Sequence, residues 1–200
     1  MKLFITGTDT DIGKTTVSIQ LLKAFKQAGY TAIGLKPLAT GNSNDAQQLK
    51  EASAIQLEDV IVNPIHFAPA IAPHIASAKE NVALSVKMLA EKIQPGLTYP
   101  ADIHVVEGVG GWHVPLNNEE TMADFVKQCG LSVILVVGIK LGCLNHAILT
   151  AEAIIAHNVP LLGWIANHPM PDVTHSKEMI ETLKTWIKAP LLKTVDYGVR

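Results

Sequence analysis

The first 28 residues constrain the fold of this chain more than any other stretch. Residues 2–6 are mostly apolar and predict a short buried strand, whereas residues 17–28 show the apolar spacing of a helix. Between them, residues 7–15 resemble G-x-x-x-x-G-K-[ST], with Gly7, Gly13, Lys14 and Thr15 as the characteristic residues and five rather than four residues between the two glycines. A strand, this glycine loop and a helix in that order predict a phosphate-binding loop.

The physical basis of that prediction is local. Glycines let backbone N–H groups surround an anion, and the helix N-terminus adds a positive partial charge. Lys14 can reach the outer phosphates, and the Thr15 hydroxyl can ligate Mg²⁺. The alternative is a chance glycine turn before a helix, which the flanking strand and helix disfavour.

Apolar runs alternate with helical patterns along the rest of the chain. Near-continuous runs of Ile, Val and Leu predict strands that are buried on both faces of a parallel sheet. We therefore predict an α/β fold like that of P-loop NTPases, doubly wound, in one domain over residues 1–200. The sequence predicts strands at 31–36, 102–106, 131–137, 161–167 and 191–195, helices at 45–53, 75–79, 85–93, 145–157 and 174–187, a loop at 37–44 and an irregular segment at 57–73.

Composition excludes several classes of function. The chain has 200 residues, of which 48% are hydrophobic, so it can bury a sizeable core. A net charge of −2 gives no electrostatic reason to expect nucleic acid or an anionic membrane as partner. The apolar runs are shorter than the roughly 20 residues that span a bilayer, and because a strand is predicted from residue 2, we expect no signal peptide. Cys129 and Cys143 form no C-x-x-C pair, which favours a cytoplasmic location.

Polar residues follow the predicted strands, where open α/β sheets bind their ligands. Glu107 follows an apolar strand at the place where P-loop enzymes hold Mg²⁺, and Asp45 and Thr15 would complete a set of oxygen ligands. Lys36 could supply a second fixed positive charge for phosphoryl transfer. Two simpler readings remain open, since Lys36 could be solvated and Asp45 could only cap a helix. Cys143 has no histidine partner in the sequence that would make it a nucleophile.

With these residues assembled, the chain resembles the dethiobiotin synthetase family over nearly its full length. The resemblance is carried by residues 6–15, 34–37, 73–77, 106–112 and 140–147, and the last two segments are specific to the family. It implies an ATP- and Mg²⁺-dependent ligase of biotin biosynthesis. Such an enzyme adds CO₂ to 7,8-diaminononanoate through a carbamate and a carbamic–phosphoric anhydride, closes the ureido ring, and releases ADP and phosphate.

The resemblance also implies roles for individual residues. Lys14 and Lys36 would be catalytic, and Thr15, Asp45 and Glu107 would hold Mg²⁺. The implied ATP-binding residues are Asp11, Ile12, Gly13, Lys14, Thr15, Thr16, Asp45, Glu107, Gly108, Val109, Gly110, Asn167 and His168. The implied substrate-binding residues are Thr10, Thr40, Gly142, Cys143 and Asn145. The last three would bind the substrate carboxylate from a neighbouring subunit, which implies a homodimer with its active site at the interface.

Some positions depart from the family pattern, and two other functions share features of this sequence. Thr40 stands where a serine is expected, Asp11 where a glutamate is usual, and His168 where an aspartate is expected. A dimeric switch ATPase of the partition type shares the phosphate loop, but residues 8–12 lack the extra lysine of that group. An amidoligase of the cobyrinate type usually needs a glutaminase domain, for which 200 residues leave little room.

Overall fold

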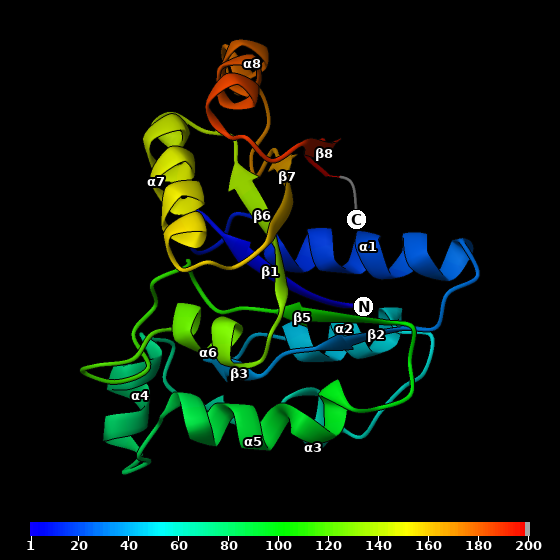
Figure 1. Ribbon diagram of the computed structural model, residues 1–200, viewed down its shortest axis with the longest axis vertical. Coiled ribbons are helices and arrows are strands. Elements are labelled where there is room, and N and C mark those ends of the chain that lie inside the picture. Colours follow the sequence, from blue (N-terminus) through cyan, green and yellow to red (C-terminus); the bar gives the residue numbers. More distant parts are fainter. Residues whose placement is uncertain (199–200) are drawn as a thin grey trace.

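A six-stranded parallel sheet forms the centre of the computed structural model, which describes residues 1–198 (Figure 1). The strand order is β2-β5-β1-β6-β7-β8, and every neighbouring pair is parallel. Parallel neighbours need crossover connections, so helical segments lie between the strands. The six strands are β1 (Lys2–Gly7), β2 (Ala32–Leu35), β5 (Ile103–Glu107), β6 (Ser132–Gly138), β7 (Leu161–Asn167) and β8 (Leu191–Val195).

Helices cover both faces of this sheet. Successive side chains of a strand point to opposite faces, and both faces are therefore apolar and buried. Leu3 and Ile5 of β1 belong to one hydrophobic cluster, together with residues of α1 and α2, whereas Phe4 belongs to a larger cluster with residues of α5 to α8. The predicted doubly wound fold is therefore confirmed. The helices are α1 (Lys14–Gln27), α2 (Asp45–Ala52), α3 (Asp59–Val62), α4 (Pro73–Lys79), α5 (Val86–Leu97), α6 (Met122–Gln128), α7 (Cys143–Ala156) and α8 (Ser176–Trp186).

The chain between β2 and α4 is more ordered than predicted. The predicted loop at 37–44 contains strand β3 (Leu38–Thr40), and the segment at 57–73 contains α3 and strand β4 (Ile65–Phe67). Strands β3 and β4 pair in parallel as a separate small sheet. The prediction was wrong here because strands of three residues show no alternation, and their pairing partner is distant in the sequence.

Helix α6 was also missing from the prediction. It begins with a capping box, in which the Thr121 hydroxyl and N–H both donate to the Asp124 carboxylate at 2.8 Å. A capping box usually carries Glu or Gln at that third position, and the short Asp gave a weaker signal. Helix α5 continues past Pro95 to Leu97, beyond its predicted end at residue 93.

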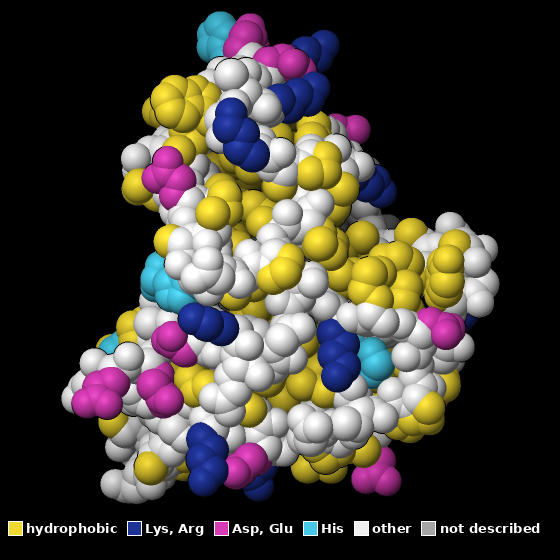
Figure 2. Space-filling view, in the orientation of Figure 1, with side chains coloured by type: hydrophobic (Ala, Val, Ile, Leu, Met, Phe, Trp, Pro, Cys, Tyr) yellow, Lys and Arg dark blue, Asp and Glu magenta, His cyan; other side chains and the backbone are white. Residues whose placement is uncertain are grey.

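Several large hydrophobic side chains are exposed near the α7–α8 end of the sheet. Figure 2 shows hydrophobic side chains at the surface over this part of the molecule. The exposed residues there are Leu141, Leu149, Ile155, Leu162, Trp186 and Leu192. None of the helices within residues 1–198 is both long enough and apolar enough to cross a membrane.

Candidate active site

The loop between β1 and α1 has the geometry of a phosphate cradle. Gly13 has a φ of 89°, a left-handed conformation that glycine adopts without steric cost. A Cβ atom at Gly13 would lie 2.3 Å from Nδ2 of Asn167, so only glycine lets the loop pass this close to the end of β7. The N-terminus of α1 lies directly behind the loop and favours an anion there.

Lys14 is buried, and its ammonium group is held against the loop. Its Nζ atom donates a hydrogen bond of 2.9 Å to the backbone carbonyl of Asp9. Burial, and next the positive charge of Lys36, lowers the pKa of Lys14 to about 8. A bound triphosphate would favour the charged form of Lys14 again, so the attraction between Lys14 and the anion would increase on binding.

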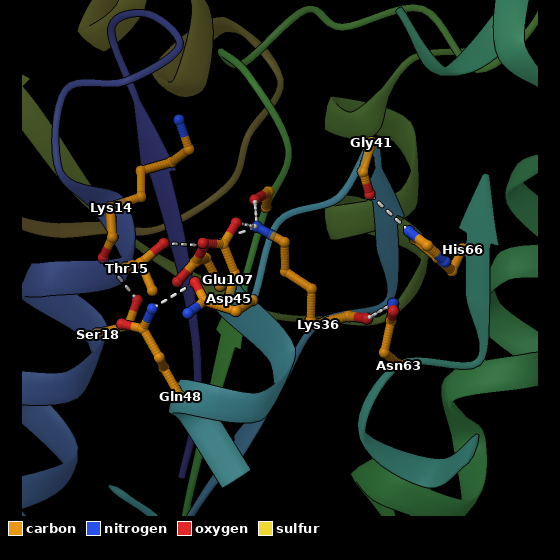
Figure 3. A network of polar contacts seen from close by, with 12 residues as sticks. Lys14, Thr15, Ser18, Lys36, Gly41, Asp45, Gln48, Asn63, His66 and Glu107 are labelled. Carbon is orange, nitrogen blue, oxygen red and sulfur yellow. Dashed lines mark hydrogen bonds and ion pairs between the residues drawn. The ribbon is translucent and has the colours of Figure 1, made fainter. Parts of the chain in front are cut away.

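Four polar side chains converge beside the loop (Figure 3). The Lys36 Nζ atom lies 2.6 Å from Oε1 of Glu107 and 3.3 Å from Oδ2 of Asp45. The Thr15 hydroxyl donates to the same Glu107 oxygen at 2.9 Å. Lys36 and Glu107 are only 3% and 1% exposed, and charges this deeply buried require opposite partners.

These contacts decide between the readings that the sequence left open. Lys36 is not a solvated lysine at a strand end, because it is buried and paired with two carboxylates. Asp45 does not cap α2, because Asn44 is the N-cap residue and Asp45 is the first helical residue, and its carboxylate faces Lys36. The direct pairing of Lys36 with both acids was not predicted.

Strand register brings these residues together. Leu35 pairs with Val106 across β2 and β5, and Ile5 pairs with Glu107 across β1 and β5. The residues that follow β1 and β2 and the last residue of β5 therefore meet at one edge of the sheet. Lys36 directly follows β2, so its side chain enters the cluster there.

The oxygen atoms of the cluster suit a hard divalent cation. Oε2 of Glu107 is buried and has no hydrogen-bond partner, although a buried carboxylate oxygen normally has one. The other carboxylate oxygen, Oε1, accepts from the Thr15 hydroxyl and from Lys36, and Lys36 also contacts the Asp45 carboxylate. Mg²⁺ prefers this kind of carboxylate and hydroxyl set, so the residues fit the metal that the sequence predicted.

One cavity lies over the cluster, and a second cavity shares part of its wall. The first has a volume of about 350 Å³ and the second of about 540 Å³. Both are lined by Thr10, Asp11, Thr40, Val109 and Gly110, which therefore form their boundary. The first is also lined by Gly13, Lys14, Thr15, Lys36, Ala39, Ser43, Asp45 and Glu107, and the second by the mostly apolar set Ala70, Ile71, Ala72, Pro73, Val114 and Pro115.

A third cavity lies on the other side of the phosphate loop, at the end of β7. It has a volume of about 270 Å³, and Asn167 is held at its wall by a 2.7 Å hydrogen bond from Nδ2 to the Ile12 carbonyl. Its lining includes Asp11, Gly13, Thr16, Asn167, His168, Pro169, Asp196, Tyr197 and Gly198. The Ile12 side chain, which belongs to the loop, is buried. On the side of the charged cluster, the Gly108 carbonyl accepts a hydrogen bond of 3.0 Å from Lys36 Nζ.

The predicted carboxylate-binding residues do not line these three cavities. Gly142 and Asn145 are exposed at the N-terminus of α7, where Gly142 has a φ of 88°. Cys143 is buried, with Sγ 3.8 Å from Sδ of Met179, so its side chain faces the core. Any contact of Cys143 with a ligand would have to come from its backbone.

The sequence reasoning missed residues that hold Lys36 in place. Its N–H donates to the Val62 carbonyl at 2.7 Å, and Asn63 Nδ2 donates to the Lys36 carbonyl at 2.7 Å. Both partners lie in the segment that was predicted to be irregular. No local pattern marks them, because their role depends on a tertiary contact with the residue after β2.

Comparisons with known proteins place the chain among ATP-dependent relatives. A family model described as an AAA domain matches residues 1–197. The "ATP-dependent dethiobiotin synthetase BioD" of Pseudomonas aeruginosa (strain UCBPP-PA14) is 43% identical over 200 residues, covering 96% of this chain and 88% of the relative. The "ATP-dependent dethiobiotin synthetase BioD 1" of Escherichia coli O157:H7 is 44% identical over 199 residues, with the same coverage.

Solved structures with low sequence identity share the fold. Chloroplast FtsY from Physcomitrella patens matches with a TM-score of 0.59 at 15% identity, covering 99% of this chain and 59% of that chain. A ParA family ATPase from Chlorobium tepidum matches with a TM-score of 0.59 at 13% identity, covering 98% and 84%. At such identities the similarity concerns the fold alone. The sequence relatives are far closer, and they show that the chain belongs to the dethiobiotin synthetase family.

Proposed function

We propose that the protein is an ATP-dependent dethiobiotin synthetase, which closes a ureido ring on 7,8-diaminononanoate with CO₂. One observation carries the proposal: a phosphate loop, two lysines and two carboxylates converge on a cavity that shares part of its wall with an apolar one. The 43% identity to a named synthetase over nearly the whole chain supports the same conclusion.

The first cavity suits the triphosphate of ATP. The loop N–H groups and the α1 N-terminus would hold the phosphates, with Lys14 placed to neutralise them. The cavity beside Asn167 and His168 would hold the nucleobase, because it shares Asp11 and Gly13 of the phosphate loop with the first cavity. Mg²⁺, held by Thr15, Asp45 and Glu107, would offset negative charge on the phosphate oxygens.

The second cavity suits the carbon chain of the diamine. Its wall from Ala70 to Pro73 is mostly apolar, and Thr10 and Thr40 stand where it meets the phosphate side. Their hydroxyl groups could hydrogen-bond a carbamate there. The reacting end of the substrate would then face the terminal phosphate of ATP.

The reaction requires three bond exchanges, for which the lysines supply electrostatic stabilisation. An amine nitrogen attacks CO₂ and loses a proton, which gives a carbamate. A carbamate oxygen then attacks the γ-phosphorus, whose bond to ADP breaks, giving a carbamic–phosphoric anhydride. The second amine attacks the carbamoyl carbon, loses a proton and displaces phosphate, which closes the ring. Lys36 and Lys14 would neutralise the carbamate and the γ-phosphate, and such preorganised charge is a large source of catalysis.

A second copy of the chain would complete the site. The N-terminus of α7, with Gly142, Cys143 and Asn145, would bind the substrate carboxylate of the neighbouring subunit. The exposed hydrophobic residues on and beside α7, such as Leu141 at 92% exposure, are consistent with a face that another chain covers. We therefore propose a homodimer whose two sites lie at the interface.

The direct test is to incubate the protein with ATP, Mg²⁺, bicarbonate and 7,8-diaminononanoate. Phosphate release that depends on the diamine, with dethiobiotin identified by mass spectrometry, is the expected result. Slow hydrolysis that DNA or lipid stimulates, with no effect of the diamine, would instead favour a switch ATPase. A reaction with bicarbonate omitted and CO₂ removed is the matched control.

A further inference from the structure

Asp9 and Lys140 form an ion pair between the phosphate loop and the segment that leads into α7. Nζ of Lys140 lies 3.0 Å from Oδ2 of Asp9. The two side chains are 31% and 46% exposed, and ion pairs this accessible contribute little to folding. Neither residue lines the three cavities described above.

Asp9 makes three contacts that together orient its own peptide group. Oδ1 accepts a hydrogen bond of 2.8 Å from the Thr10 N–H, and Oδ2 accepts one from Lys140 Nζ. Its backbone carbonyl accepts the 2.9 Å hydrogen bond from Lys14 Nζ. The side chain therefore determines which way the Asp9–Thr10 peptide faces, and that peptide holds the ammonium group of Lys14.

Lys140 is a suitable anchor because its backbone is held on both sides. The N–H of Ile139 donates to the Asn167 carbonyl at 2.8 Å, and the Lys140 carbonyl accepts from the Cys143 N–H at 3.0 Å. The Thr8 N–H donates to the Val136 carbonyl at 3.1 Å, which keeps the start of the phosphate loop beside β6. Lys140 thus reaches the loop from a part of the chain that the sheet and the first turn of α7 hold in place.

We propose that Asp9 and Lys140 are positioning residues, whose ion pair orients the Asp9–Thr10 peptide and so places Lys14 and Thr10 for the reaction. This inference rests on the proposed function and adds a link between the phosphate loop and the N-terminus of α7. The hydrogen bond from Lys140 lowers the pKa of Asp9, so the carboxylate stays charged at neutral pH. Thr10 lines the cavity over the cluster and the second cavity, so a turn of this peptide would displace a wall that both share.

The test uses Lys140→Met and Asp9→Asn in the full chain, with Lys50→Met as matched control. Lys50 forms an ion pair of 2.6 Å with Asp59, in which the lysine is likewise partly buried, away from Lys14. Because misplacement of about 1 Å can cost a factor of about 100 in rate, we expect kcat to fall roughly 10- to 100-fold in either variant. The KM for ATP should change by less than about threefold, since the contacts that bind the ground state and the transition state equally are kept.

Two further variants separate positioning from a merely structural role. Lys140→Arg keeps the charge and should restore most of kcat, and the double variant Asp9→Asn/Lys140→Met should be no worse than Lys140→Met alone. A clearly lower melting temperature for Lys140→Met, together with a kcat that Lys140→Arg does not restore, would overturn the proposal. The control Lys50→Met should keep the wild-type kcat.

A readout without turnover keeps this proposal separate from the proposed function. Amide hydrogen exchange of Thr10, measured by NMR without substrate, should accelerate several-fold in Lys140→Met and stay unchanged in Lys50→Met. Unchanged exchange together with unchanged kcat would overturn the positioning role. Failure of the wild-type protein to release phosphate with the diamine would overturn the proposed function, whereas the exchange result would still decide how Asp9 is held.

Discussion

The two ends of the candidate active site differ in how completely one chain builds them. At the phosphate end, Lys36 and Glu107 are 3% and 1% exposed and contact each other at 2.6 Å. At the other end, Leu141 is 92% exposed and Asn145 is exposed at the start of α7. The charges proposed to act in phosphoryl transfer are preorganised by the fold of a single chain, whereas the proposed carboxylate-binding end lies open on its surface.

This difference follows from the cost of burying charge. A buried lysine and glutamate are stable only when strand ends and a helix hold them together, so their geometry must be built within one chain. A helix N-terminus can bind an anion while it remains at the surface, because its N–H groups are solvated until the ligand arrives. Substitutions at the two ends should therefore have different effects.

The largest expected effect is at the buried end. Lys36→Ala should lower kcat by about three orders of magnitude, a loss typical of a group that stabilises transition-state charge. ATP binding, measured by calorimetry, should be largely retained. The variant leaves Glu107 unpaired, which should cost about 3–5 kcal/mol of unfolding free energy, so its melting curve must be recorded as well. An equal loss of ATP affinity and rate would instead make Lys36 a ground-state phosphate clamp.

Glu107→Gln should weaken the dependence of activity on Mg²⁺. The amide keeps the size of the side chain but removes the negative charge beside Lys36 and Thr15. We expect the Mg²⁺ concentration for half-maximal rate to rise by about 10-fold or more, the scale seen when one partner of a metal site is lost. Glu120→Gln, away from this cluster, is the control. An unchanged Mg²⁺ titration would remove Glu107 from the metal site.

Asn145→Ala tests the open end. Losing one hydrogen bond to a charged group costs about 1.5–3 kcal/mol, so the KM for the diamine should rise roughly 10- to 100-fold. The KM for ATP should not change, and Glu152→Ala on the exposed side of the same helix should behave as wild type. A rise in the KM for ATP would contradict the assignment.

Mixing subunits sharpens the comparison. A heterodimer of one Lys36→Ala chain and one Asn145→Ala chain would contain one site with both native residues if the two ends come from different subunits. We expect such mixed dimers to recover turnover with the wild-type KM for the diamine. If both ends belonged to one chain, each site would keep one defect and no recovery would be observed.

The smallest effect concerns pH. Because the pKa of Lys14 is lowered to about 8, the free enzyme loses this charge as the pH rises through about 8. The ratio kcat/KM for ATP should therefore decline a few-fold above that pH. Lys14→Arg keeps its charge, since arginine stays protonated throughout the pH range in which Lys14 titrates, and its alkaline decline should disappear even if its rate at neutral pH is lower. The same decline in both proteins would assign it to another group.

Folding stability should show the opposite trend. The folded pKa of Lys14 lies below its ordinary value of 10.5, so the unfolded chain binds more protons between the two values. The free energy of unfolding contributed by this group should therefore increase as the pH rises from about 8 towards 10. Denaturant melts of the wild-type protein and Lys14→Met across this range would isolate that contribution.

Much of the fold could be predicted from local pattern. The parallel sheet was predicted from apolar runs, because strands buried on both faces carry Ile, Val and Leu almost without interruption. Strands β3 and β4 and helix α6 could not be predicted in this way. The first two are too short to show a period, and α6 has only a weak capping signal at Asp124.

The sequence by itself determined the phosphate loop and the position of Lys36, Asp45 and Glu107 at the ends of successive elements, because spacing along the chain is enough for both. Only the tertiary structure decided that Lys36 pairs with both carboxylates and that Asp9 is held by Lys140. Those contacts join residues that are far apart in the chain, and only strand order, register and the packing of α2 and the α7 segment against the sheet bring them within hydrogen-bonding distance.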